Sequence, residues 1–348
     1  MVTTRQVLAL AFVSMAVCGP ATARDSHAAP TYAKVGEVAV GGEGGWDYLT
    51  LDEQTSRLYV SHSTSYAVID TKSNAVVGTI ADTPGAHGFA IAPGVGLGFT
   101  TNGRENKVSV VDLKTLKTVS KIDVAEGPDA ILYASASKHV YAFCGDGNCA
   151  SVIDPKTSKV VATVALGGAP EFAVEDPKAG RIYNNLEDKN EVVAIDEKTN
   201  TVVARWPLAP GETPTGLAID LDHHRLFSGC RNGHVIALDS TSGKVVATWP
   251  IGKGVDACRY DARLHLVFAS CSDGTVTIAD QVTPDSYRVV QTLATGPGAR
   301  TMTLDTRTHQ IYLATAEFKP APEPAAGQPR ARPAVVAGTF KIIVFAPK

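Results

Sequence analysis

Short apolar runs alternate with polar turns along almost the whole chain. Two apolar residues and an aspartate, followed by a polar turn and then often a Val-Val pair, recur at a nearly fixed interval. These aspartates stand 41 to 43 residues apart, at Asp70, Asp112, Asp154, Asp196, Asp239 and Asp280. β-Branched and aromatic residues in short runs, bounded by Asp, Gly, Pro and Asn, predict strands and turns. A strand-rich repeat of this length indicates a repeat architecture.

Each repeat contains four predicted strands. In the fourth repeat we expect them at residues 171–174, 181–184, 191–195 and 202–206. The recurring aspartate follows the third strand, where its carboxylate can accept hydrogen bonds from backbone amides of the turn. We therefore assign these aspartates a structural role. Four antiparallel strands in about 42 residues make one blade of a β-propeller.

Seven blades are expected. Their first strands begin near Trp46, His87, Pro128, Pro170, Pro214, Val255 and Ala299. The last repeat ends with a third strand at residues 342–345, so it lacks its fourth strand, whereas a spare strand at 34–40 precedes the first blade. We expect this spare strand to become the outer strand of the seventh blade, which leaves no open sheet edge at the seam. The predicted fold is an all-β, seven-bladed β-propeller.

The N-terminus resembles a secretory signal peptide. Arg5 precedes an apolar run at residues 7–17, and Ala21-Thr22-Ala23 is a small-x-small cleavage signal. The predicted organisation is a signal peptide at 1–23, a linker at 24–31 and a propeller at 32–348. The apolar run is too short for a stable membrane anchor. We expect a periplasmic or secreted protein after cleavage.

Composition narrows the choice of partners. The chain has 348 residues, of which 44% are hydrophobic, and a formal net charge of −3. A large core is possible, and the absence of a long basic run weighs against nucleic-acid binding. No other apolar segment is long enough to span a bilayer. We expect a monomer.

Export permits disulfides. Cys144 and Cys149 flank the flexible segment 145–148 and are a candidate pair. One further pair is expected among Cys230, Cys258 and Cys271, and the sequence does not choose which. The chain has six cysteines, of which Cys18 lies in the predicted signal peptide; the five that remain after cleavage leave one free thiol or an intermolecular bond.

The seventh repeat carries a Pro-rich insertion at about 317–338, between its second and third strands. Its composition predicts a long loop without regular structure. Loops of this length in compact domains are usually functional or disordered.

Two strand motifs resemble a known repeat. Leu58-Tyr59-Val60-Ser61 and the x-Val-Ile-Asp third strand resemble the YVTN repeat. Over residues 32–348 the chain resembles the YncE-like exported bacterial seven-bladed propellers. This resemblance implies the fold and export, and it implies no particular activity.

One position in the repeat differs from blade to blade. The second residue of the first strands is in turn Asp47, His87, Asp129, Glu171, Thr215, Asp256 and Arg300. A core position should carry similar apolar residues in every repeat, whereas six of these seven are ionisable. The innermost strands start at one face of the ring, and the loops after the second strands reach the same face. Those loops add Asn102, Arg104, Asn185 and Arg231, so we predict a ligand site at the channel mouth.

The residues at the channel mouth are compatible with several functions. Its carboxylates could hold a divalent metal such as Ca²⁺, with Glu171, Asp129 and Asp256 as candidate ligands, although no cofactor is certain. Alternatively, His87 and Arg300 offset the acids in a solvated mouth. Our leading hypothesis is a binding protein for a small ligand or a protein partner, which is not an enzyme. The alternatives are a metal-dependent, lactonase-like hydrolase and a ligand-free scaffold. We assign no catalytic residue.

Overall fold

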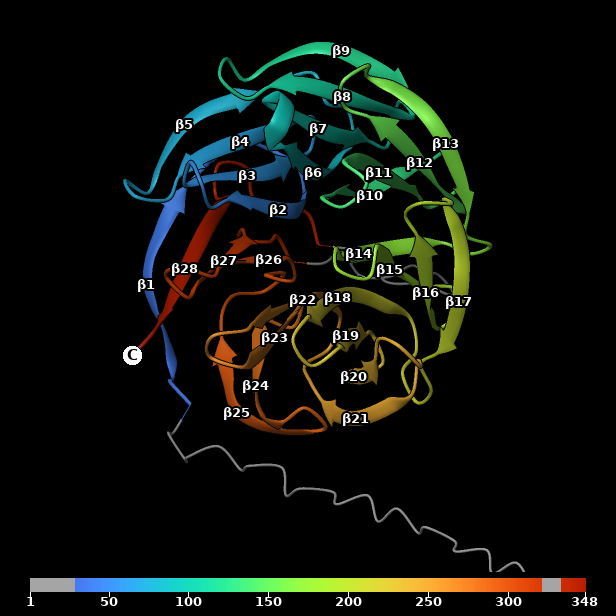
Figure 1. Ribbon diagram of the computed structural model, residues 1–348. Coiled ribbons are helices and arrows are strands. Elements are labelled where there is room, and N and C mark those ends of the chain that lie inside the picture. The colour runs from blue at the N-terminus through green and yellow to red at the C-terminus, as the bar shows by residue number, and fades with distance from the viewer. Residues whose placement is uncertain (1–28, 321–332) are drawn as a thin grey trace, which may run out of the picture.

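The computed structural model describes residues 29–320 and 333–348. In this part of the chain, 28 strands form seven four-stranded antiparallel sheets around a common centre (Figure 1). The predicted seven-bladed propeller is therefore confirmed. The expected signal peptide, 1–23, lies outside the described residues, as does most of the expected linker. No helix among the described residues is long and apolar enough to cross a membrane.

Within the first six blades, chain order equals sheet order from the centre outward. The first blade consists of β2 (Trp46–Asp52), β3 (Arg57–His62), β4 (Ser65–Asp70) and β5 (Ala75–Ile80). The second consists of β6 (Ala86–Ala92), β7 (Leu97–Asn102), β8 (Lys107–Asp112) and β9 (Lys117–Asp123). The third consists of β10 (Pro128–Ala134), β11 (His139–Cys144), β12 (Cys149–Asp154) and β13 (Lys159–Ala165). A single 3-10 turn, η1 (Pro93–Val95), separates β6 from β7.

The remaining blades follow the same plan. The fourth blade consists of β14 (Pro170–Asp176), β15 (Arg181–Leu186), β16 (Glu191–Asp196) and β17 (Thr201–Pro207), and the fifth of β18 (Pro214–Asp220), β19 (Arg225–Cys230), β20 (His234–Asp239) and β21 (Val245–Pro250). The sixth consists of β22 (Val255–Asp261), β23 (Leu266–Cys271), β24 (Thr275–Thr283) and β25 (Ser286–Ala294). The seventh consists of β26 (Met302–Asp305), β27 (Gln310–Thr315), β28 (Lys341–Pro347) and β1 (Tyr32–Ala39). The four strands predicted for the fourth blade are all present and one to three residues longer.

The N-terminal strand closes the ring, as predicted. β1 pairs antiparallel with β28, with Tyr32 opposite Pro347 and Val38 opposite Ile342. Figure 1 shows β1 beside β28 in the seventh blade. Tyr32 and Val38 are buried, and the Tyr32 hydroxyl donates a hydrogen bond to the carbonyl of His309 at 2.9 Å.

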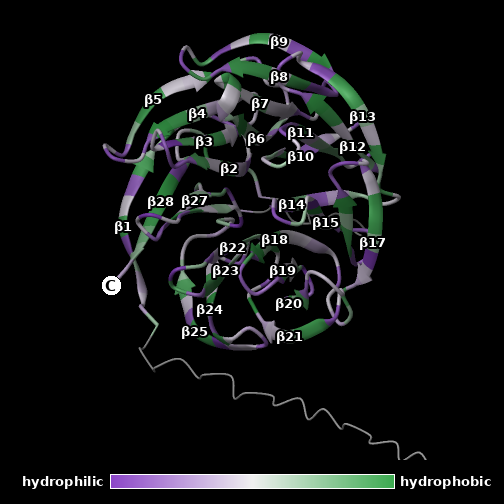
Figure 2. Cartoon of the chain, in the orientation of Figure 1, coloured by the Kyte–Doolittle hydropathy of each residue, from purple (hydrophilic) through white to green (hydrophobic). Residues whose placement is uncertain are grey.

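The core lies between neighbouring blades. The second and third strands of each blade are almost wholly buried, because the apolar faces of the two neighbouring blades cover them on both sides. Tyr59 of the first blade stacks on Phe89 of the second, with ring centroids 4.2 Å apart. The outermost strands expose part of their apolar residues, Val77 and Val161 among them. Most of the hydrophobic colour in Figure 2 lies on the strands, and the turns are largely hydrophilic.

Five of the six recurring aspartates cap their turns. The Asp70 carboxylate, for example, accepts hydrogen bonds from the amides of Lys72 and Ser73 at 2.9 and 2.8 Å. The prediction is wrong for Asp280, which lies inside β24 and pairs with Arg288. The sixth blade extends this hairpin, because residues 281–283 continue the strand before the chain turns.

The insertion leaves β27 and returns to β28, as predicted. Its two ends approach each other through an isolated bridge between Phe318 and Val335, and the Lys319 amide donates to the carbonyl of Ala334 at 2.8 Å. Residues 321–332 of the expected loop lie outside the described residues.

All five cysteines of the described chain are buried free thiols. Cys144 and Cys149 lie opposite each other on β11 and β12. The predicted disulfide between them, and the one among Cys230, Cys258 and Cys271, therefore remain predictions.

Candidate binding site at the channel mouth

A bulge in the first strand of blades one to six places the variable residue of each, whereas Arg300 of the seventh blade lies just before β26. In the first six blades, pairing with the second strand shifts register directly after the first residue of the strand. Asp47 and Tyr48, for example, have no partner between the Trp46–His62 and Leu49–Val60 pairs. A bulge releases residues from the ladder and changes the direction of their side chains. The variable position of the repeat therefore falls where the strand is free of the ladder.

Six of the seven variable residues line one cavity of about 1000 Å³, which we call the cup. They are Asp47, His87, Asp129, Glu171, Asp256 and Arg300. Arg104 and Arg231 join them from the loops, and Trp46, Phe172, Met302, Phe318 and Val335 supply apolar wall. A concave site of this size is typical of small-molecule binding, and this one carries more charged side chains than such sites usually do.

Three of the residues expected at the mouth lie outside the cup. Thr215 is buried, and its hydroxyl donates to the carbonyl of Val255 in the next blade at 2.8 Å. The Asn185 amide donates to the carbonyl of Thr215 at 2.9 Å, and that of Asn102 donates to Glu105 and Ser109. Asn185 and Thr215 thus join neighbouring blades, whereas Asn102 fixes its own hairpin.

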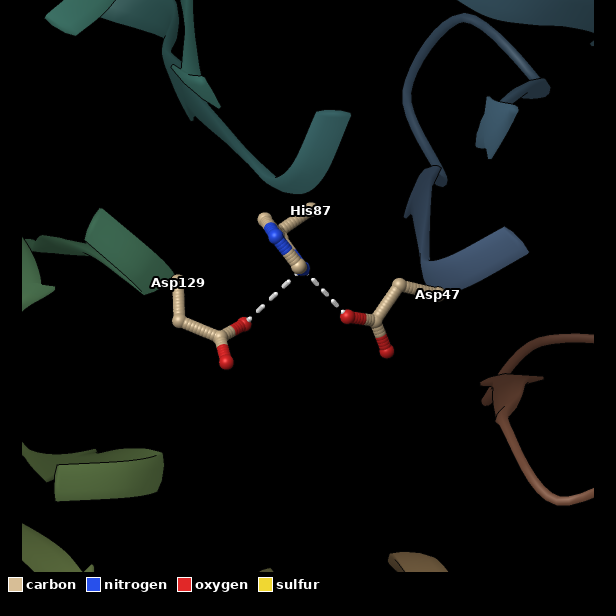
Figure 3. A group of neighbouring side chains, drawn as sticks. All are labelled: Asp47, His87 and Asp129. Atoms are coloured by element: carbon tan, nitrogen blue, oxygen red, sulfur yellow. Dashed lines mark hydrogen bonds and ion pairs between the residues drawn. The ribbon is translucent and has the colours of Figure 1, made fainter. Parts of the chain in front are cut away.

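Asp47, His87 and Asp129 converge at one side of the cup (Figure 3). His87 Nδ1 lies 2.6 Å from Asp47 Oδ2 and 3.4 Å from Asp129 Oδ1. The imidazole packs over Gly103, where a Cβ atom would lie only 2.9 Å from Nε2. The absence of a side chain at Gly103 therefore lets the ring point between the two carboxylates, which come from the first and third blades.

The pKa values of this group are displaced upward. Burial alone would lower the pKa of His87, but its hydrogen bond to Asp47 and the negative charge of Asp129 raise it to about 9. Burial and the charge of Asp47 raise the pKa of Asp129 to about 7. Burial, the charge of Asp129 and a hydrogen bond with Glu187 raise the pKa of Glu171 well above its usual value. Burial and the repulsion between neighbouring carboxylates thus favour the protonated forms of Asp129 and Glu171.

The other side of the cup holds paired charges. Arg300 Nε donates to Asp256 at 2.6 Å, and Arg300 Nη2 donates to the carbonyl of Trp46 at 3.2 Å. Arg231 bridges Glu187 at 3.0 Å and Asp256 at 3.5 Å. These two arginines are therefore engaged by carboxylates of the protein itself.

Three side chains that the sequence analysis missed form the floor of the cup. Tyr48 of the first blade meets Phe172 of the fourth, with ring centroids 5.4 Å apart, and the guanidinium of Arg259 lies 4.5 Å from the centroid of Phe172. All three also line a smaller cavity of about 50 Å³. Because strands from opposite sides of the ring supply these contacts, we conclude that the channel is obstructed at this depth. The signal was present in the sequence: aromatic residues stand at 48 and 172, where four other blades carry Gly or Ala.

The atoms best placed for a metal differ from those predicted. The predicted ligands were Glu171, Asp129 and Asp256, but one ligand atom from each of Asp47, His87 and Asp129 lies within 4.8 Å of the other two. Two carboxylates and an imidazole fit a divalent transition metal better than Ca²⁺, which prefers oxygen ligands. The imidazole must be neutral to coordinate, so a proton competes with a metal at Nδ1.

Comparisons with known proteins add support for the fold alone. No protein-family model matches the chain, and no curated protein matches its sequence. The resemblance to YVTN and YncE-like propellers therefore stays a prediction. A solved structure, Kuenenia stuttgartiensis hydrazine synthase, is similar with a TM-score of 0.68 and 19% sequence identity, covering 79% of this chain and 94% of that one. At this identity the likeness shows that both chains share the propeller fold.

Proposed function

We propose that this chain is an exported binding protein that takes a small ligand into the cup. The observation that carries the proposal is the group of carboxyls at Asp129 and Glu171, whose pKa values are raised inside a cavity of about 1000 Å³. A ligand with a cationic group would replace the retained protons and relieve the repulsion. The signal-like sequence at 1–23 supports export.

A ligand screen by thermal shift tests the proposal. A compound present at a hundred times its Kd should stabilise the protein by about 2.7 kcal/mol, which is a clear rise in Tm. Glu171→Gln should reduce that rise. Glu175→Gln is the matched control, because Glu175 lies on the same strand, β14, outside the cup. A set of stabilising compounds whose effect is the same in both variants would contradict binding in the cup.

A metal-dependent hydrolase of lactonase type is the second candidate. The convergence of Asp47, His87 and Asp129 favours it. A divalent metal there would supply a Lewis acid for a substrate carbonyl. Since the pKa of His87 is about 9 and that of Asp129 about 7, metal affinity should rise about tenfold per pH unit between about pH 7 and 9, and more steeply below pH 7. Calorimetric titration with Zn²⁺ and Mn²⁺ at several pH values, in the wild type and in His87→Gln, checks this. An absence of metal binding across the range, or binding that His87→Gln leaves unchanged, rules the candidate out.

A further inference from the structure

The floor of the cup carries a cation, Arg259, that no acid of the described residues neutralises. Within residues 29–320 and 333–348, the one hydrogen bond found for the Arg259 guanidinium runs from Nη1 to the carbonyl of Cys258, at 2.7 Å. Burial lowers the pKa of Arg259 to about 10, and no carboxylate of the described chain counteracts it. A guanidinium has five N–H donors, so most of them remain free. An anion that reached Arg259 would offset the cost of burying this charge.

The groups around Arg259 suit the end of an elongated ligand. The guanidinium lies against the ring of Phe172, and both side chains line the cup. Tyr48 completes the floor, and no hydrogen bond of its hydroxyl is found in the described part of the chain. A carboxylate at this depth would meet donors from Arg259 and Tyr48.

The end of the cup at Asp129 and Glu171 favours a positively charged group of the ligand. Asp129 shares one cationic partner, His87, with Asp47, and no ion pair of Glu171 is found within the described residues, whereas Arg231 and Arg300 are held by carboxylates of the protein. The carboxylates of Asp47, Asp129 and Glu171 thus outnumber their cationic partners, and among the described residues Arg259 has no anionic partner. Apolar wall from Phe172 and Trp46 lies in the same cavity.

We propose that the cup binds a small zwitterion, with its ammonium group at Asp129 and Glu171, its carboxylate at Arg259 and its carbon chain against Phe172. This assignment rests on the proposed binding function and names the chemical class of its ligand. An amine without a carboxylate satisfies one end of the cup, and a carboxylate without an amine satisfies the other.

Calorimetry with matched linear compounds tests the assignment on the wild-type protein. The probes are ω-amino acids from β-alanine to ε-aminocaproic acid, together with the α,ω-diamine and the dicarboxylate of each length. We expect one length of amino acid to bind best, and its diamine and dicarboxylate to bind at least about tenfold more weakly, which corresponds to about 1.4 kcal/mol. Diamines that bind as well as the amino acids would overturn the assignment.

Variants locate the two ends. Arg259→Gln should weaken binding of the best amino acid about tenfold or more and should not weaken binding of the matched diamine, because it removes a charge that repels the second ammonium, whereas Asp129→Asn should weaken both. Arg288→Gln is the control, because Arg288 lies exposed on β25, away from the cup, and should change neither. If Arg259→Gln does not fold, Tyr48→Phe removes a floor donor with little change of volume and should weaken the amino acid alone.

The outcomes distinguish a failure of the zwitterion assignment from a failure of the proposed binding function on which it rests. Suppose that diamines bind as well as the amino acids, and that their binding is weakened by Asp129→Asn but not by Arg259→Gln. The cup is then a cation site, so the zwitterion assignment is wrong although the binding function is supported. If none of these compounds binds, the assignment falls. If in addition no compound of the wider screen gives a thermal shift that depends on Glu171, the binding function falls with it.

Discussion

Aspartate has two opposite roles in this propeller, and the surroundings of each carboxylate determine which one it takes. Asp196 lies in a turn, where hydrogen bonds from the Thr199 backbone and from Arg181 lower its pKa to about 2. Asp129 lies in the cup, where burial and a neighbouring carboxylate raise its pKa to about 7. The first stabilises the fold in its ionised form. The second is costly when ionised, which is typical of a position kept for binding.

The raised pKa of Asp129 predicts a pH-dependent effect of Asp129→Asn. Between about pH 4 and 7 the folded protein retains a proton that the unfolded chain has lost, so wild-type stability falls as pH rises through this window. Asparagine removes that loss. We expect the difference in unfolding free energy, variant minus wild type, to increase by about 2 kcal/mol from pH 4 to 7, about half of the full linkage value, because the site is partly solvated. Urea denaturation at a series of pH values measures it.

Asp196→Asn is the control of opposite sign. Its carboxylate contributes stability above the usual pKa of an aspartate, and this contribution is lost as pH falls toward 2. The variant should therefore be less stable than the wild type at pH 7 and should approach it in acid. A difference for Asp129→Asn that stays flat between pH 4 and 7 would show that Asp129 is ionised in the folded protein.

We also predict that Cys144 and Cys149 form a disulfide when the protein is secreted into an oxidising compartment. They are partners on adjacent antiparallel strands, where Cα atoms lie about 4.5–5.5 Å apart, within the range of a disulfide. The bond would add no more than about 2 kcal/mol, because it closes a short loop. Peptide mass spectrometry after alkylation under denaturing conditions should find the two peptides linked in protein from the periplasm and separate in protein made without residues 1–23. Full alkylation of both samples would contradict the prediction.

Among the secondary-structure elements, β1 matters most for the closure of the ring. It supplies the outer strand of the seventh blade, and without it β28 would expose an unpaired edge. Val38 is 4% exposed and packs with Trp46 and Leu58, whereas Val35 on the same strand is 57% exposed. The two faces of this strand therefore differ sharply in how much a charge should cost.

Val38→Asp should destabilise the protein by about 3 kcal/mol or more, because it buries a carboxylate without a partner. Val35→Asp should change stability by no more than about 0.5 kcal/mol, as exposed substitutions usually do. Urea denaturation of both variants makes the comparison. Equal effects would mean that β1 is not docked on the seventh blade in solution.

Strand positions were predictable because each blade repeats the same alternation of apolar runs and turns. The blade-four strands and the closing strand follow from this pattern. Asp280 was not predictable from the repeat, because the longer β24–β25 hairpin moves the turn beyond it. The bulges of the first strands were also missed, although they explain why the variable residues face the cup.

The whole molecule is a ring in which each blade is held by its neighbours. Second and third strands are buried in every blade, whereas outer strands such as β5, β9 and β13 are largely exposed. Amide hydrogen exchange should therefore be slowest in the second and third strands of all seven blades and fastest in the outer strands. β1 should exchange no faster than the other outer strands. Early exchange throughout the seventh blade would show that the ring opens at its seam.

The sequence by itself determined the number of blades, the closure of the ring and the variable residues that supply most of the ionisable side chains of the cup. These depend on short-range patterns, which the repeat presents seven times. The tertiary structure alone decided that Tyr48, Phe172 and Arg259 meet at the axis, that Thr215 is withdrawn from the cup and that His87 joins Asp47 and Asp129. Such contacts join different blades, some of them on opposite sides of the ring. They depend on how far each side chain reaches across the ring, and no periodicity along the chain encodes that distance.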